Sequence, residues 1–282
     1  ALYTSVFAAR ILLMRITLIV PYFGKWPEWF PAFLLSCKYN TSIQWLFYTD
    51  CEPPGTYYEN VKFIYGSLTD LSKLASIRVG FNVSLTSPYK ICDLRPAFGE
   101  IFQEHIKDRE FWGHCDVDII WGDIRTFITN DILGGYSVIS ARKQNIAGHF
   151  TLYKNTPQIN SLYRLFPQFP ALINSPQNYM FDEIGMTQII RNLVARQLLR
   201  VYWPKFLLNF ANPRNDAPSV LDGYTNGWYW THGKLYDQTD GNHEIMYLHF
   251  MTWKDSLKQI DFSYDNHPGS FNITSTSIFS SY

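Results

Sequence analysis

Residues 110–124 read EFWGHCDVDIIWGDI, an apolar run with two aspartates, Asp116 and Asp118, at its centre. A carboxylate inside an apolar strand is unfavourable unless a partner compensates its charge. In an extended segment, residues i and i+2 point to the same side, so both carboxylates can approach one cation or its water shell. Mg²⁺ and Mn²⁺ bind carboxylate oxygens and share their coordination with substrate phosphates. The stretch therefore predicts a strand ending at a metal–nucleotide site; a polar turn or a pair of caps is the alternative.

The segments before this stretch alternate between strand and helix patterns. β-Branched apolar runs predict buried parallel strands at 16–23, 43–50, 60–67 and 109–122. Helical spacing predicts helices between them at 28–40, 68–81 and 95–108. Such alternation is typical of an α/β fold with a mostly parallel sheet.

The second half of the chain is more mixed. Its predicted elements are strands at 136–141, 149–155 and 244–250 and an amphipathic helix at 181–196. We expect one domain over 15–282, with a nucleotide-binding half at 15–125 and an acceptor and catalytic half at 126–282. Residues 1–14 are expected to be an N-terminal extension.

Composition narrows the function classes. The net charge is +0 and no basic run occurs, which argues against nucleic-acid binding. The four cysteines form no C-x-x-C pair and indicate reduced thiols in a cytosolic protein. Arg10 and Arg15 interrupt the apolar N-terminus, so a transmembrane helix is not expected there. Dinucleotide-binding and nucleophile-elbow glycine motifs are absent from the sequence.

Five segments, in order, resemble the signatures of GT-A glycosyltransferases, and most closely a bacterial family linked to capsule and O-antigen polysaccharide synthesis. They are IVPYFGKWP (19–27), FYTD (47–50), PYKICDLRPAFG (88–99), FWGHCDVDIIWGDI (111–124) and YLHFMTWK (247–254). The resemblance implies a GT-A, Rossmann-like fold: a mostly parallel central sheet flanked by helices, with a mixed C-terminal acceptor lobe. In open α/β sheets ligands bind beyond the carboxyl ends of the strands, where Asp50 and the Asp116–Asp118 pair are both predicted.

The same resemblance implies a set of donor-nucleotide contacts. The loop after the first strand would hold uracil through Pro21, Tyr22 and Phe23, and the end of the second strand would contact base or ribose through Thr49 and Asp50. Taken without the resemblance, Asp50 is a strand-ending cap or turn residue.

Three charged residues in the third signature, Lys90, Asp93 and Arg95, are the next candidates. A cation near a diphosphate is physically sensible, so Lys90 and Arg95 are expected to meet phosphate or sugar. Asp93 is expected to orient Arg95 or to accept a sugar hydroxyl. A salt-bridged helix start explains the same residues equally well.

The metal ligands implied by the resemblance come from two distant parts of the chain. Asp118 would bind Mn²⁺ or Mg²⁺ directly, Asp116 directly or through water, and His249 would complete the site. Lys254 would meet the leaving diphosphate. A core histidine is the alternative for His249.

The catalytic residues are expected at the start of the 181–196 helix. Inverting GT-A enzymes use a carboxylate there as the general base, which points to Asp182 or Glu183; the helix dipole alone also explains acids at this position. His149 is expected to line the donor-sugar or acceptor pocket.

The resulting hypothesis is a metal-dependent, inverting glycosyltransferase of cell-surface polysaccharide synthesis. Its donor would be a UDP-sugar, with galactose or galactofuranose as the sugar, and its acceptor a glycan or a lipid-linked oligosaccharide. It would act in the cytoplasm and contact the inner membrane peripherally when the acceptor is lipid-linked. Two other classes stay open: a lectin-like inactive relative, and a nucleotide-sugar hydrolase or phosphotransferase.

Overall fold

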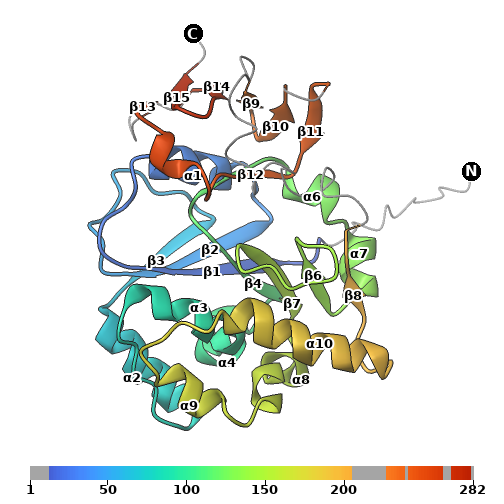
Figure 1. The fold of residues 1–282 in the computed structure, drawn as a ribbon. Helices are drawn as coiled ribbons and strands as arrows, with labels where there is room; N and C mark the ends of the chain where they lie inside the picture. The colour runs from blue at the N-terminus through green and yellow to red at the C-terminus, as the bar shows by residue number, and fades with distance from the viewer. Residues whose placement is uncertain (1–12, 205–226, 239–240, 263–267, 281–282) are drawn as a thin grey trace, which may run out of the picture.

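The computed structural model describes residues 13–204, 227–238, 241–262 and 268–280. Within these ranges a seven-stranded central sheet has the order β3-β2-β1-β4-β7-β6-β8 (Figure 1). Its strands are β1 (Ile16–Tyr22), β2 (Ile43–Thr49), β3 (Val61–Tyr65), β4 (Phe111–Cys115), β6 (Val138–Ser140), β7 (Phe150–Lys154) and β8 (Val201–Tyr202). Residues 1–12 of the predicted extension lie outside the described residues.

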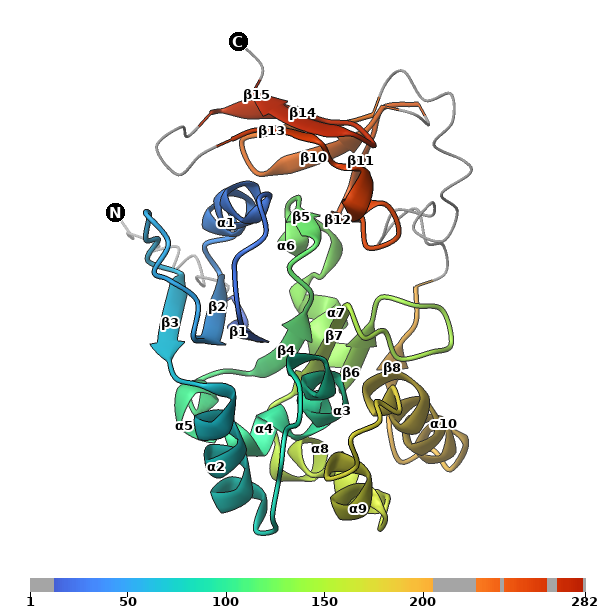
Figure 2. The same cartoon turned by 60° about the vertical axis from the view of Figure 1, so that its left-hand side comes forward.

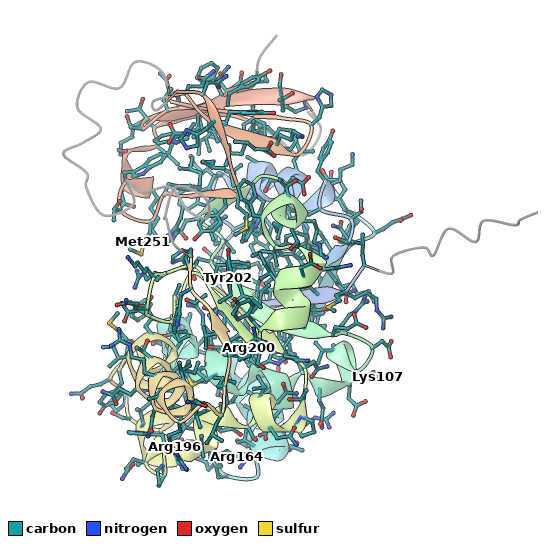
Figure 3. All side chains as sticks on the ribbon, turned by 90° about the vertical axis from the view of Figure 1, so that its right-hand side faces the viewer. Lys107, Arg164, Arg196, Arg200, Tyr202 and Met251 are labelled. Carbon is teal, nitrogen blue, oxygen red and sulfur yellow. The ribbon has the colours of Figure 1, made fainter. Side chains whose placement is uncertain are left out.

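The first four strands of this sheet are parallel, as the apolar runs predict. Ile19 on β1 is paired with Leu46 on β2 and with His114 on β4. β7 runs antiparallel to both β4 and β6, and β6 is parallel to β8. At the β8 edge, the rings of Tyr202 and Tyr136 meet edge to face, and Arg200 lies over Tyr136. Tyr202 and Arg200 are labelled in Figure 3.

Helices cover both faces of the central sheet (Figure 1). The α-helices are α1 (Phe30–Lys38), α2 (Leu68–Val79), α3 (Ile91–Leu94), α4 (Phe98–Ile101), α5 (Gln103–Ile106), α6 (Ile124–Phe127), α7 (Asn130–Gly135), α8 (Pro157–Asn160), α9 (Phe169–Ile173) and α10 (Met186–Ala195). Helix α1 packs Phe30 and Phe33 onto one face of the sheet. Helices α2 and α10 bury Leu71 and Ile190 on the other. The predicted α/β class is therefore confirmed.

The C-terminal part of the chain forms a second sheet with the order β11-β10-β9-β14-β15-β13 among the described residues. Its strands are β9 (Trp228–Thr231), β10 (Lys234–Asp237), β11 (His243–Ile245), β13 (Gln259–Asp261), β14 (Ser270–Ile273) and β15 (Ser277–Ser280). Trp228 and Trp230 of this sheet share a core with Ala32 and Leu35 of α1. Helix α1 therefore lies between the two sheets (Figure 2), and the predicted mixed C-terminal lobe is confirmed.

Four predicted elements are interrupted in the structure. The predicted strand 109–122 divides into β4 and β5 (Ile119–Trp121), and 244–250 divides into β11 and β12 (Tyr247–His249). The predicted helix 95–108 is a 3₁₀ turn followed by α4 and α5, and the predicted helix 181–196 begins as a π-helical turn, Phe181–Gly185, before α10. Tertiary packing has overridden the simple periodicity at these four places.

No helix among the described residues combines the length and apolar character that a membrane crossing requires.

Candidate active site

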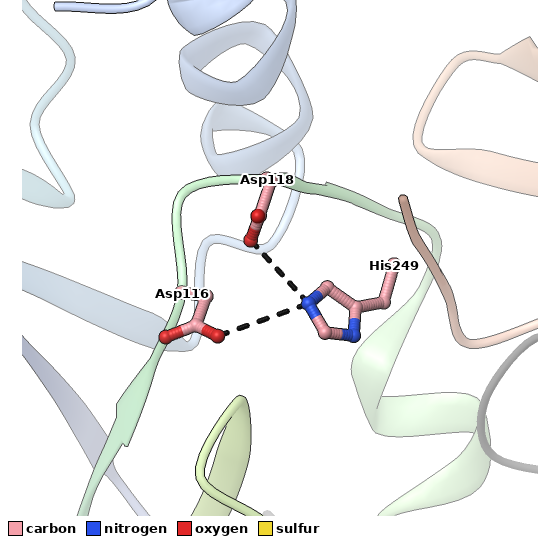
Figure 4. Close-up of side chains that lie close together, drawn as sticks. All are labelled: Asp116, Asp118 and His249. Carbon is pink, nitrogen blue, oxygen red and sulfur yellow. Dashed lines mark ion pairs between the residues drawn. The ribbon is translucent and has the colours of Figure 1, made fainter. Parts of the chain in front are cut away.

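The chain bends between β4 and β5, and this bend places the two aspartates at the carboxyl end of β4. The Asp116 amide donates to the His149 carbonyl, and the Phe250 amide donates to the Asp118 carbonyl, so the bend is fixed from both sides. Strand β12 pairs antiparallel with β5, with His249 opposite Ile119. This pairing sets the imidazole of His249 beside both carboxylates (Figure 4).

The three side chains converge on one point. His249 Nε2 lies 3.4 Å from Asp118 Oδ1 and 3.7 Å from Asp116 Oδ2 (Figure 4). Asp118 Oδ1 and His249 Nε2 are buried and have no hydrogen-bond partner within the described ranges. These spacings are close to the roughly 3 Å between adjacent ligands of Mg²⁺ or Mn²⁺. Two carboxylates and one imidazole also suit such an ion chemically, so the residues fit a divalent metal.

The other oxygen of each aspartate is held by a cation. Arg95 Nη2 is 2.5 Å from Asp116 Oδ1, and Lys254 Nζ is 2.8 Å from Asp118 Oδ2. Each carboxylate therefore turns one oxygen toward His249 and keeps the other on a protein cation. Burial opposes ionisation of Asp118, but His249 and Lys254 outweigh it and lower the pKa of that carboxyl.

Arg95 joins the candidate metal-binding residues to the first candidate base. Its Nη1 is 3.0 Å from Asp182 Oδ2 and donates to the Gly148 carbonyl at 2.8 Å. Asp182 is buried, and burial raises the pKa of its carboxyl to about 6; Arg95 partly offsets this effect, and Glu183 adds to it. Such a carboxylate is ionised at neutral pH and still accepts a proton readily.

Glu183 is held by neighbouring groups on both of its carboxylate oxygens. One of its carboxylate oxygens accepts the Gly148 amide at 2.9 Å, and the other lies 2.8 Å from Arg142 Nη1. Both oxygens of Asp182 are held as well, because Oδ1 accepts the Glu183 amide at 3.1 Å and Oδ2 lies 3.0 Å from Arg95 Nη1. Hydrogen bonding therefore does not separate the two acids, and the raised pKa is the property that distinguishes Asp182 as the candidate base.

His149 supports His249. The two rings stack with centroids 4.3 Å apart, and His149 Nε2 is 2.6 Å from the Tyr247 hydroxyl. Burial lowers the pKa of His149 well below its usual value, and the nearby His249 lowers it further. The His149 ring is therefore neutral at pH 7. The pair thus resembles a metal ligand held by a neighbouring side chain.

A cavity of about 690 Å³ surrounds this cluster, a size that suits a small-molecule ligand. The predicted site residues that line it are Pro21, Tyr22, Phe23, Arg95, Asp116, Asp118, His149, Asp182, Glu183, His249 and Lys254. Other lining residues include Trp29, Tyr89, Arg142, Asn178, Met180 and Met251, which the sequence analysis missed. Arg142 belongs to no motif, and only the folded chain brings it to Glu183.

Lys90 and Asp93 lie outside the residues that line the cavity, and their contacts with donor phosphate or sugar stay a prediction. Lys90 Nζ is buried and donates to Asp93 Oδ2 and to the carbonyls of Leu172 and Gln177. All three ammonium hydrogens therefore have internal partners. Asp93 accepts from Lys90, not from Arg95 as predicted, and the alternative of a salt-bridged helix start describes this pair correctly.

Thr49 and Asp50 are also outside the residues that line the cavity. Thr49 is buried, and its hydroxyl accepts the Cys51 amide at 3.0 Å. Asp50 accepts the Gly24 amide at 2.7 Å and so holds the loop after β1. Their contact with base or ribose stays a prediction.

The fold and site thus define an α/β protein with a candidate divalent-metal centre at the ends of its parallel strands. Residues 18–281 match a family of unknown function (DUF6625), and the chain belongs to that family. A search of curated proteins finds no match.

Three solved structures are similar to this chain at low identity. Mouse xyloside xylosyltransferase 1 in its apo form is 10% identical with a TM-score of 0.41, over 83% of this chain and 97% of that one. The galactosyltransferase LgtC with donor and acceptor sugar analogues is 13% identical with a TM-score of 0.39, over 84% and 87%. The apo glycosyltransferase GlyE of Streptococcus pneumoniae TIGR4 is 12% identical with a TM-score of 0.33, over 67% and 45%. A function therefore has to follow from the chain's own side chains.

Proposed function

We propose that the protein is a metal-dependent glycosyltransferase that transfers a sugar from a UDP-sugar to a glycan acceptor with inversion. One observation carries the proposal: the buried Asp118 Oδ1 and His249 Nε2, which have no hydrogen-bond partner among the described residues, face each other at 3.4 Å beside Asp116. Polar atoms left unpaired in a protein interior are costly, and a shared cation removes that cost. The cavity around them also holds a candidate base and several cations.

Mn²⁺ or Mg²⁺ would be held by Asp116, Asp118 and His249, and when bound it supplies positive charge that stabilises a departing diphosphate. Lys254 lies against Asp118 and adds a second positive charge at the same place. Tyr22 and Phe23, at the end of β1, offer aromatic faces for the uracil ring.

Asp182 is proposed as the general base. The acceptor hydroxyl oxygen attacks the anomeric carbon, its proton passes to the Asp182 carboxylate, and the bond from that carbon to the UDP oxygen breaks. One displacement of this kind inverts the anomeric configuration. Arg95 holds one Asp182 oxygen in place, at 3.0 Å, and so orients the carboxylate.

The finer assignments depend on the resemblance to capsule and O-antigen enzymes. They are galactose or galactofuranose as the donor sugar, a glycan or lipid-linked oligosaccharide as the acceptor, and a cytoplasmic enzyme with peripheral contact to the inner membrane.

A panel of UDP-sugars with Mn²⁺, Mg²⁺ or EDTA, read by UDP release, tests the proposal. We expect release that needs the metal, rises with a glycan acceptor, and is lost in Asp118→Ala. Asp108→Ala, which removes an exposed aspartate that does not line the cavity, is the matched control. Full activity in EDTA contradicts the metal role. A rate of UDP release that does not change when acceptor is added indicates a hydrolase. Glycan binding without turnover indicates a lectin-like protein. NMR of the product anomer tests inversion.

A further inference from the structure

Three apolar side chains line the cavity and yet are largely exposed. They are Tyr89, Met180 and Met251, with exposed fractions of 69%, 45% and 44%. Figure 3 shows Met251 between the C-terminal sheet and the helices below the central sheet. Neither metal binding nor diphosphate binding uses these residues. Exposed apolar groups gathered at a cavity mark a ligand contact.

The backbone that presents Met180 is held in an uncommon conformation. Met180 has φ 51°, in the left-handed region that side chains other than glycine rarely adopt. The next residues form the π-helical turn that carries Asp182. Backbone strain of this kind persists only where surrounding contacts enforce it, and it concentrates at functional sites.

The buried Lys90–Asp93 pair provides the contacts that hold this backbone conformation. Asp93 accepts the amides of Tyr179 and Phe181, at 3.0 and 2.8 Å, on either side of Met180. Lys90 donates to the Gln177 carbonyl at 2.5 Å. The segment before Asp182 is thus anchored to the fold by two buried charges.

Asn178 links Tyr89 to Met180. Its Nδ2 donates to the Tyr89 carbonyl at 3.1 Å, and its Oδ1 accepts the Met180 amide at 2.9 Å. Partial burial raises the pKa of the Tyr89 phenol, and the charges of Cys92 and Asp182 raise it further. The phenol therefore lies close enough to Asp182, the candidate base, for the two groups to interact electrostatically. The two exposed side chains therefore belong to one preformed wall next to Asp182.

We propose that Tyr89 and Met180 form the subsite for the acceptor sugar, with a pyranose ring stacked through its C–H face on Tyr89 and a hydroxyl directed at Asp182. Asn178 is a positioning residue that joins the backbones of Tyr89 and Met180. A tyrosine ring suits a sugar because it offers an apolar face and a polar edge. This inference rests on the proposed function, since it names the acceptor side of the same site.

Steady-state kinetics of four variants test the subsite. The acceptor probe is whichever methyl glycoside of galactose, glucose or N-acetylglucosamine most increases UDP release by the wild type, together with its octyl counterpart. In Tyr89→Ala we expect the acceptor KM to rise tenfold or more while the KM for the UDP-sugar changes less than threefold. Tyr89→Phe keeps the ring and should stay within threefold of the wild type for both. Asn178→Ala should raise the acceptor KM several-fold with kcat nearly unchanged.

Tyr57→Ala is the matched control, because Tyr57 is 62% exposed and lines a different cavity; it should change neither KM. An unchanged acceptor KM in Tyr89→Ala, or an equal rise in the donor KM, overturns the subsite. A rise with the octyl glycoside alone also overturns it, because the ring then contacts the chain and not the sugar. If the wild type releases no UDP from any donor, the proposed function itself fails, which is a different result.

Discussion

Asp118 Oδ1 and His249 Nε2 face each other at 3.4 Å. Asp118 directly precedes β5 and His249 ends β12, and these two strands from opposite halves of the chain pair antiparallel. The two atoms are buried and have no hydrogen-bond partner within the described residues. A cation that binds both stabilises the folded state over the unfolded chain, which holds no such site. The thermal midpoint should therefore rise with Mn²⁺, by the equivalent of about 2.7 kcal/mol at a concentration 100 times the Kd.

The matched variants for this measurement are Asp118→Ala and Asp108→Ala, observed by differential scanning fluorimetry with and without Mn²⁺. We expect the shift to disappear in Asp118→Ala and to persist in Asp108→Ala. A shift of the same size in both variants would place the ion elsewhere. Because this measurement needs no substrate, it tests the metal site even if the donor is misassigned.

The second prediction concerns Tyr247, which contacts His249 indirectly through His149. The Tyr247 hydroxyl is 2.6 Å from His149 Nε2, and His149 stacks on the metal-ligand candidate. Side chains behind a ligand typically change metal affinity about 10–100-fold when removed. Tyr247→Phe should therefore weaken Mn²⁺ binding by about tenfold, measured by calorimetry, with little change of fold. Unaltered affinity would limit Tyr247 to a packing role.

The third prediction concerns catalysis by Asp182, whose pKa is raised to about 6 by burial in spite of Arg95. A general base must be ionised, so kcat/KM should rise with pH up to about 6 and then level off. Asp182→Asn should reduce kcat by about 10²–10⁴-fold and abolish this inflection. An inflection that persists near pH 6 in the variant belongs to another group.

The raised pKa of Asp182 also predicts that the stability of the folded protein falls as the pH rises, whereas its catalytic activity rises. Its folded-state pKa of about 6 exceeds the ordinary value of 3.8, so the folded protein favours the protonated form. The contribution to stability is fully present below pH 3.8 and is lost as the pH rises through about 6. Relative to the wild type, Asp182→Asn should gain about 2–3 kcal/mol between pH 4 and pH 7 in chelator. A constant difference across this range contradicts the raised pKa.

The sequence predicts most of the fold because its strands are continuous apolar runs, a pattern that needs both faces of a sheet covered. It predicts the grouping of Asp116, Asp118 and His249 only through the resemblance to a family, since no spacing rule joins residues in opposite halves of the chain. The π-helical turn at Phe181–Gly185 and the contact of Arg142 with Glu183 have no sequence signal. Both depend on tertiary closure.

Lys90 and Asp93 show the limit of reading charge from sequence. In a sequence, a lysine and an aspartate three residues apart indicate a solvated ion pair or a phosphate contact. Only their burial in the folded chain shows that the pair instead anchors a neighbouring segment. Their exposed fractions are 1% and 0%, a property that depends on how α9 and the segment at 177–181 fold over them. Internal anchoring and substrate binding make different predictions for stability.

The fifth prediction uses that difference. Lys90→Met leaves the buried Asp93 charge without its cation and should reduce the free energy of unfolding by about 3–5 kcal/mol. The matched control is Lys73→Met, because Lys73 pairs with Asp70 at 3.4 Å with the same spacing but is 70% exposed. Exposed pairs contribute little, so the control should change stability by less than about 1 kcal/mol. Urea denaturation of both variants provides the comparison. Equal, small losses in the two variants would mean that Lys90 is not an internal anchor, and the fixed wall beside Asp182 would lose its support.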